Sequence, residues 1–196
     1  MAKIILTTHQ KGGVGKSTIT YNLAVNLKEN AKVCIVDMDL QGSLINISEL
    51  SEVPIVSADK LKDVTNGDYD FIFIDTPPYI SDSISQLCRI ADVIIIPTKA
   101  GVLDLLAIKS TIDIVKEEKA DKKALIVFNM VKPNTTLTEE IKSQLNDYGV
   151  RVSKNMVSDL VAFSRSVLLN GVEENRNAQK QIDGLTKEIL TLSINK

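Results

Sequence analysis

The segment Gln10–Thr18 (QKGGVGKST) has the composition of a phosphate-binding loop. Its three glycines allow backbone N–H groups to turn inward toward phosphate oxygens. Lys16 is placed to reach the β- and γ-phosphates of a nucleotide, and the hydroxyl of Ser17 is placed to bind Mg²⁺. A second lysine, Lys11, precedes the glycines. One lysine is enough for a phosphate loop, so Lys11 needs a separate explanation.

Carboxylates follow two other apolar runs of the sequence. Asp37 and Asp39 come at the end of the run KVCIVD and just after it. Residues at i and i+2 of a strand point to the same side, and two neighbouring negative charges favour a bound cation. Asp75 follows four apolar residues, a pattern called Walker B, and is expected to bind Mg²⁺ through water. The sequence therefore predicts a magnesium site at the ends of these strands.

The order of the expected elements brings these residues together. Five runs rich in β-branched residues predict buried parallel strands: Lys3–Thr8, Lys32–Asp37, Asp70–Asp75, Asp92–Pro97 and Lys123–Asn129. Helical spacing predicts helices at Ser17–Lys28, Leu103–Lys119, Thr136–Tyr148 with Thr138 as a cap, Asp159–Asn170 and Asn177–Leu192. This alternation predicts an α/β fold, a doubly wound and mostly parallel sheet with helices on both faces, in a single domain over 1–196. Ligands bind such sheets at the carboxyl ends of the strands.

Composition excludes several classes of protein. The chain has 196 residues, of which 44% are hydrophobic and 24% charged, as in a soluble globular protein. The net charge of −2 does not by itself require a nucleic-acid or membrane partner. Cys34 and Cys88 lack metal-ligand spacing and fit a reducing compartment. The sequence shows no signal-peptide core and no apolar run near the roughly 18 residues of a membrane span, so we expect a cytoplasmic protein.

The phosphate loop departs from the standard motif in one respect. The pattern G-x-x-x-x-G-K-[ST] requires glycine where Gln10 stands, and the chain reads K-G-G-x-G-K-[ST] instead. This resembles the deviant Walker A box of the ParA/MinD family of P-loop ATPases, and the small ParA-type partition ATPases most of all. The resemblance implies that Lys11 reaches across a nucleotide-sandwich dimer to the phosphates of the partner subunit. Lys11 and Lys16 would both be catalytic, with Lys11 acting as an arginine finger does elsewhere.

The resemblance also implies roles for residues outside the loop. The family pattern D-x-D-P-Q-G is matched by the segment after the second strand, except that Leu40 replaces the proline. Asp37 would then lie near the Mg²⁺ shell, Asp39 would orient or activate the attacking water, and Asn129 would hydrogen-bond the adenine. The expected metal ligands are Ser17, Asp37 and Asp75. The expected ATP/ADP contacts are Lys11, Gly12, Gly13, Val14, Gly15, Lys16, Ser17, Thr18 and Asn129. The loop at 154–157 is expected to complete the adenine pocket, and the role of Asp104 is left open.

The partners implied by the resemblance are a second copy of the chain, DNA and an adaptor. A ParA-type partition ATPase would dimerise with ATP, bind DNA non-specifically and be stimulated by a ParB-like adaptor, in the cytoplasm and on the nucleoid when ATP is bound. DNA binding requires a cationic surface. The candidate cations are Arg151, Lys154, Arg165, Arg176 and Lys180. The chain begins almost directly on the first strand, so we expect no N-terminal helix-turn-helix domain.

Two alternatives compete with this interpretation. A MinD-like positioning ATPase would act on a membrane or on protein cargo, but the final segment 185–196 has few positive charges and aromatic residues, and its apolar stripe is more typical of a helix packed on the core. We therefore expect no stable membrane association. A relative with an iron–sulfur cluster would need four thiolates, whereas Cys34 is expected in the core and only Cys88, on a helix after Asp75, is expected to be exposed. His9, the sole histidine, is expected to shape the phosphate loop.

Overall fold

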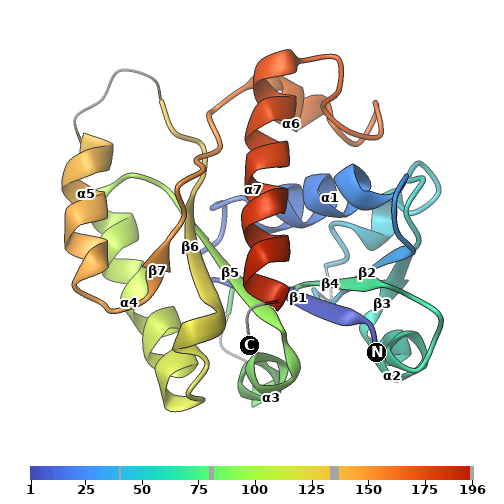
Figure 1. Cartoon of the computed structure of the whole chain (residues 1–196), viewed down its shortest axis with the longest axis horizontal. Coiled ribbons are helices and arrows are strands. Elements are labelled where there is room, and N and C mark those ends of the chain that lie inside the picture. The colour runs from blue at the N-terminus through green and yellow to red at the C-terminus, as the bar shows by residue number, and fades with distance from the viewer. Residues whose placement is uncertain (40, 80–81, 133–136, 195–196) are drawn as a thin grey trace.

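The computed structural model describes residues 1–39, 41–79, 82–132 and 137–194. Within these ranges seven strands form one sheet in the order β3-β2-β4-β1-β5-β6-β7 (Figure 1). The strands are β1 (Lys3–Thr7), β2 (Val33–Asp37), β3 (Ile55–Ser57), β4 (Phe71–Asp75), β5 (Val93–Thr98), β6 (Ala124–Phe128) and β7 (Arg151–Val152). Every neighbouring pair is parallel, which confirms the predicted fold class.

The five predicted strands are all present, and none of their ends is shifted by more than one residue. The sequence missed β3 and β7, which lie at the two edges of the sheet. They have three and two residues, too few to form a recognisable apolar run. The central strands were predicted because they are buried on both faces and so consist almost wholly of apolar residues.

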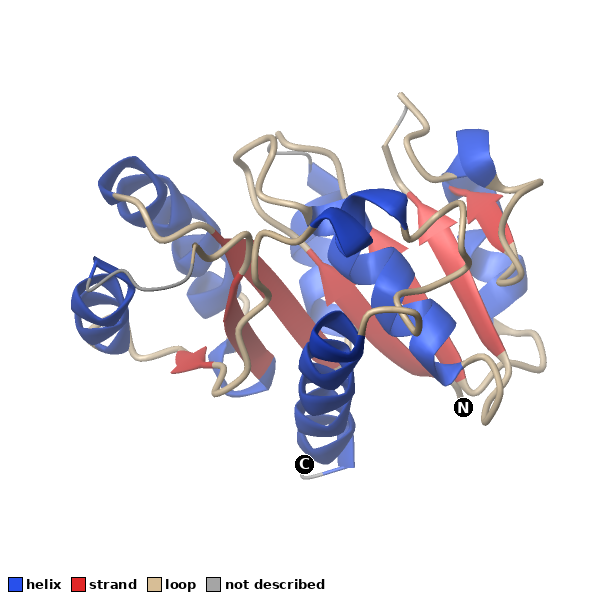
Figure 2. Ribbon diagram, turned by 90° about the horizontal axis from the view of Figure 1, so that it is seen from above, coloured by secondary structure: helices blue, strands red, loops and turns tan. Residues whose placement is uncertain are grey.

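Helices cover both faces of the sheet (Figure 2). The α-helices are α1 (Lys16–Leu27), α2 (Leu61–Thr65), α3 (Asp82–Ile90), α4 (Val102–Glu117), α5 (Leu137–Asn146), α6 (Val161–Arg165) and α7 (Arg176–Ile194), and short 3-10 turns are η1 (Ile45–Ile47), η2 (Ala58–Lys60) and η3 (Asp121–Lys123). Alternate strand residues form two cores. One includes Ile35 and Phe73 and packs on α1 and α7, and the other includes Cys34 and Ile72 and packs on α3 and α4.

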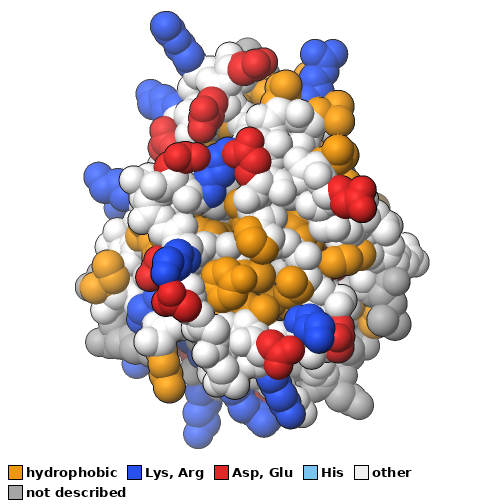
Figure 3. All heavy atoms as spheres, turned by 90° about the vertical axis from the view of Figure 1, so that its right-hand side faces the viewer, with side chains coloured by type: hydrophobic (Ala, Val, Ile, Leu, Met, Phe, Trp, Pro, Cys, Tyr) orange, Lys and Arg blue, Asp and Glu red, His pale blue; other side chains and the backbone are white. Residues whose placement is uncertain are grey.

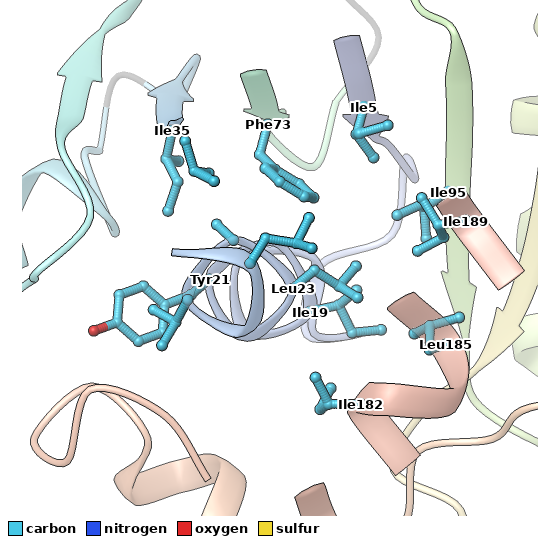
Figure 4. Close-up of a cluster of buried hydrophobic side chains, with 14 of the residues drawn as sticks. Ile5, Ile19, Tyr21, Leu23, Ile35, Phe73, Ile95, Ile182, Leu185 and Ile189 are labelled. Carbon is cyan, nitrogen blue, oxygen red and sulfur yellow. The ribbon is translucent and has the colours of Figure 1, made fainter. Parts of the chain in front are cut away.

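Helices α1 and α7 lie side by side against one face of the sheet, with Ile189 of α7 next to Ile95 of β5 in Figure 4. Ile19 and Leu23 of α1 and Leu185 and Ile189 of α7 are buried in the same cluster as Phe73. The apolar stripe of α7 therefore packs on the core, as the sequence predicted. No helix within the described ranges is long and apolar enough to span a bilayer.

Three local predictions need correction. The helix expected at 159–170 is only the five-residue α6, which ends at Arg165 and is followed by turns over 166–170, and the positive φ angles of Asn170 and Gly171 keep the chain from resuming a helix there. Thr138 lies inside α5 and does not cap it, while the predicted start at 136 lies outside the described residues. Cys88 is fully buried rather than exposed, since its helix faces the core, and Cys34 is buried as predicted.

Candidate nucleotide-binding site

The phosphate loop connects β1 to α1, and its glycines are required by its backbone path. Gly13 and Gly15 have φ angles of 71° and 86°, in the left-handed region that L-residues rarely adopt. A Cβ at Gly15 would also lie 2.1 Å from Nδ2 of Asn129. Since α1 begins at Lys16, the positive end of its dipole faces the loop, as an anion site requires.

Lys16, Ser17 and Asp75 converge at the carboxyl ends of β1 and β4. The hydroxyl of Ser17 donates a hydrogen bond to Oδ2 of Asp75 at 2.6 Å, and the hydroxyl of Thr20 lies 3.4 Å from Oδ1. The ammonium of Lys16 lies 3.4 Å from the carbonyl oxygen of Lys11, and burial lowers its pKa. The described residues contain no cluster of three acidic or thiolate ligands. A hydroxyl and one carboxylate still fit Mg²⁺, which takes its other oxygens from phosphate and water.

Asp75 is a buried carboxyl in an environment that disfavours its charge. Its pKa is raised to about 7, mainly by burial and also by the charge of Asp37, although hydrogen bonds from Ser17 and Thr20 and the charge of Lys16 act in the opposite direction. A bound divalent cation would reverse this balance by stabilising the ionised form. The buried carboxylate is therefore costly without a cation and well suited to one.

We expect Asp75→Asn to stabilise the nucleotide-free and metal-free protein at pH 8. The folded-state pKa of Asp75 lies above the unfolded value of 3.8, so the wild-type carboxylate costs stability above pH 3.8, and the cost is complete above about pH 7. The variant should unfold at higher urea than wild type at pH 8, and the gap should close as the pH falls toward 4. Urea titrations at pH 8, 6 and 4.5 measure this, and a pH-independent gap would contradict it. Asp68→Asn, at a fully exposed carboxylate, is the control.

Asp37 and Asp39 are brought to the same edge but make different contacts. Both oxygens of Asp37 accept backbone hydrogen bonds, Oδ1 from Asp39 and Oδ2 from Leu44 and Ile45 at 2.9–3.0 Å. Asp37 therefore shapes the loop after β2, and its role in the metal shell stays a prediction. Oδ1 of Asp39 accepts the amide N–H of Gln41, and the side chain is only partly buried. Leu40, where the family has proline, lies outside the described residues.

Lys11 forms an ion pair within its own chain. Its Nζ lies 2.7 Å from Oδ1 of Asp104, on the first turn of α4, with 36% and 11% of the two side chains exposed. Gly101 makes room for this carboxylate, because a Cβ there would lie 2.7 Å from the other oxygen of Asp104. The sequence singled out both residues but gave no reason to pair them, since 93 residues separate them.

Asn129 contacts the phosphate loop directly. Its Nδ2 donates to the carbonyl of Val14 at 2.8 Å. Beside it lies a small hollow of about 60 Å³ whose lining includes Thr18, Ser158, Asp159 and Leu160. The adenine contact of Asn129 stays a prediction. The residues that line the hollow beside it include 158–160 and not the expected 154–157. A parallel bridge between Val131 and Ser158 forms this neighbourhood, and no local motif indicates it.

These features define a P-loop nucleotide-binding protein of the doubly wound α/β class. The model of the CobQ/CobB/MinD/ParA nucleotide-binding domain matches residues 5–173, and the chain belongs to this family. A relative from Halothiobacillus neapolitanus, the maintenance of carboxysome distribution protein A, is 28% identical and is covered over 93% of its length by 92% of this chain. A ParA family protein of Mycoplasma pneumoniae is 29% identical over 83% of the chain, which spans only 63% of that longer relative.

A solved structure shows the same fold. The putative plasmid partition protein of Borrelia burgdorferi bound to AMPPNP superposes with a TM-score of 0.75 at 20% sequence identity, over 97% of this chain and 99% of that one. The family that the K-G-G-x-G-K-[ST] box resembles is confirmed by the match to the family model, and the fold predicted from the alternation of strands and helices is confirmed as well. The roles of individual site residues remain predictions.

Proposed function

We propose that the chain is a ParA-type ATPase, a single domain over 1–196 that binds and hydrolyses ATP with Mg²⁺ as a nucleotide-dependent sandwich dimer. Lys16 and the loop amides hold the phosphates, and Ser17 and Asp75 hold Mg²⁺, with Asp37 near its shell. Asp39 orients the attacking water. A bound Mg²⁺ would neutralise part of the negative charge of the phosphates. The observation that carries the proposal is the second lysine beside the loop, Lys11, which this fold does not need for binding one nucleotide.

The surface around Lys11 supports a dimer. Val102, Leu103 and Leu106 on the first turns of α4 are 61%, 74% and 67% exposed, and they flank Asp104. Apolar side chains grouped next to a charged site are typical of a surface that another protein covers. A second copy bound there would bring its own Lys11 near the phosphates. ADP is the expected product, released when the dimer separates.

The ion pair between Lys11 and Asp104 would hold the first lysine in its own subunit. We expect Asp104→Asn to lower the protein concentration for half-maximal ATP-dependent dimerisation, by about threefold, the scale of a partly exposed ion pair. Sedimentation velocity with ATP measures it. Asp68→Asn, which removes a remote exposed partner of Lys32, is the control and should change nothing. Weaker dimerisation of Asp104→Asn would show that the ion pair does not restrain Lys11.

A basic groove between β7 and α7 is the best candidate for binding DNA. It has a volume of about 460 Å³ and is lined by Arg151, Lys154 and Lys187 together with Glu188. The three cations are exposed and make no ion pair within the described parts of the chain, whereas the oxygens of Glu188 accept hydrogen bonds from residues 153–155. Free cations lining a groove suit a phosphate backbone.

A row of cations on the exposed face of α7 continues the basic surface beyond the groove. Arg176, Lys180 and Lys187 follow at intervals of four and seven residues, so they share one helix face, and all three are exposed. Lys187 was not among the predicted cations, because the cations that line the groove with it lie in and just after β7, far away in the sequence. By contrast, the face on the β3 side of the molecule interleaves both signs of charge (Figure 3). The groove is therefore a local feature rather than part of a generally basic surface.

Co-sedimentation with non-specific DNA tests this part of the proposal. Lys154→Glu with Lys187→Glu should abolish ATP-dependent binding and leave ATP-dependent dimerisation intact. A matched pair, Lys62→Glu with Lys122→Glu, makes the same charge change at exposed lysines away from the groove and from α4 and should bind normally. Milder Lys→Gln changes at 154 and 187 should lower the salt dependence of log K by about one unit per lost phosphate contact. Equal losses in both pairs would assign binding to net charge, not to the groove.

Two candidate functions differ in the cargo that the ATPase positions, which is DNA in the first and protein in the second. A ParB-like adaptor that stimulates hydrolysis would couple the DNA-bound dimer, in the cytoplasm and on the nucleoid, to a DNA cargo. The carboxysome relative, covered over nearly its whole length, favours protein cargo as the second candidate. The buried stripe of α7 argues against stable membrane association of either kind, because Leu185, Ile189 and Leu192 are not available to lipid.

A further inference from the structure

His9 holds the backbone of the first lysine. It lies two residues after β1 and is fully buried. Its Nδ1 accepts a hydrogen bond from the amide N–H of Lys11 at 2.8 Å, and its Nε2 is buried without a partner among the described residues. A neutral ring whose Nδ1 accepts carries its hydrogen on Nε2. Burial first, and the charge of Lys16 next, lower the pKa of His9 to about 4, so this form persists at neutral pH.

Lys11 is held at three points, and two of them must change when the proposed ATPase works. The carbonyl oxygen of Lys11 lies 3.4 Å from the ammonium of Lys16. In the proposed ATPase this contact is lost when the Lys16 ammonium binds the phosphates. The ammonium of Lys11 forms an ion pair with Asp104. This ion pair is lost when the ammonium binds the nucleotide of the second copy. The hydrogen bond from its amide N–H to His9 takes part in neither exchange. It is the contact that can persist through both.

We propose that His9 is the pivot of this exchange, a positioning residue that fixes the Lys11 backbone while the Lys11 ammonium leaves Asp104 for the phosphates of a second copy. The inference rests on the proposed dimer. The preceding amide, that of Gln10, donates to Oγ1 of Thr111 on α4 at 3.3 Å, so the start of the loop is tied on both sides. Fixing the backbone in advance lowers the conformational entropy lost when a long side chain reaches its target.

The geometry of the bond supplies a conservative variant. The bond joins the side chain of residue 9 to the amide of residue 11, the same i to i+2 connection that Asn makes in an Asx-turn. His9→Asn retains an acceptor for this amide, whereas His9→Leu fills the space without one. A role through the acceptor predicts rescue by Asn, and a purely packing role predicts that Leu is the better replacement.

The test compares the two variants with wild type in three measurements at pH 7.5: the melting temperature, the affinity for a fluorescent ADP, and ATP-dependent dimerisation by sedimentation velocity. His9→Leu should raise the protein concentration for half-maximal dimerisation about tenfold, the scale of one lost hydrogen bond, with ADP affinity nearly unchanged. His9→Asn should stay close to wild type. Should His9→Leu not fold, His9→Ala takes its place.

The outcomes separate the pivot from the proposed function. A wild-type protein that stays monomeric with ATP refutes the dimer, and the pivot with it. A wild-type protein that dimerises, together with a His9→Leu variant that dimerises equally well, refutes the pivot alone. Equal defects in the Asn and Leu variants would also refute it, because the defect would then not follow the hydrogen-bond acceptor.

Discussion

Lys16→Ala is expected to abolish nucleotide binding. Lys16 opens α1 and is only 7% exposed, next to Asp75 and the loop amides, so its ammonium would meet the phosphates in a largely desolvated setting. Removing one partner of such a buried charge contact weakens affinity on the order of a hundredfold or more. Calorimetric titration with ATP and with ADP, both with Mg²⁺, measures the loss for each nucleotide.

The matched control for Lys16→Ala is a variant at an exposed lysine of the same chain, such as Lys109→Ala, which should bind both nucleotides as wild type does. The melting temperature of both variants without nucleotide establishes that they are folded, because the charge of Lys16 also acts on the buried Asp75 and its loss can change stability. Retained ATP affinity in a folded Lys16→Ala protein would contradict the assignment of the phosphate site.

Lys11→Ala is expected to separate binding from turnover. The ammonium of Lys11 lies on Asp104, away from the Lys16–Asp75 centre, so its loss should leave the affinity for ADP close to wild type. Dimerisation with ATP should be lost, and hydrolysis should fall on the order of a thousandfold, as when an arginine finger is removed. Phosphate release and sedimentation velocity at the same protein concentrations measure both effects.

A Lys11→Ala protein that hydrolyses ATP at the wild-type rate as a monomer would show that Lys11 does not act in trans. Lys11→Arg is the informative companion, because it keeps the charge but changes its shape and reach. An intermediate rate for this variant would indicate that charge placement, rather than charge alone, decides turnover.

The sequence predicted the central part of this molecule well for physical reasons. Parallel strands buried on both faces must be apolar throughout, so runs such as KIILT and VIIIPT are recognisable without any tertiary information. The phosphate loop is equally local, because a few consecutive residues supply its glycines, its lysine and its hydroxyl. The meeting of Ser17 with Asp75 then follows from the rule that ligands bind at the carboxyl ends of parallel strands.

What the sequence did not predict depends on contacts between distant segments. The partner of Lys11 is Asp104, and nothing within either segment specifies the other. The groove requires β7, a two-residue strand, to lie beside α7, so Lys187 was missed while Arg151 and Lys154 were named. The expected helix at 159–170 is replaced by the short α6 and a run of turns, a difference that apolar periodicity does not report. Each of these features is set by the packing of the whole sheet.

The most direct test of the central claim mixes two inactive variants. Asp39→Ala keeps Lys11 but should lack the group that orients water, and Lys11→Ala keeps Asp39 but lacks the lysine for its partner. In a mixed dimer, the site of the Lys11→Ala subunit has its own Asp39 and receives Lys11 from the other subunit. We predict that the mixture hydrolyses ATP although neither variant does so alone. A mixture that contains dimers by sedimentation and remains inactive would contradict the account of Lys11 acting in trans.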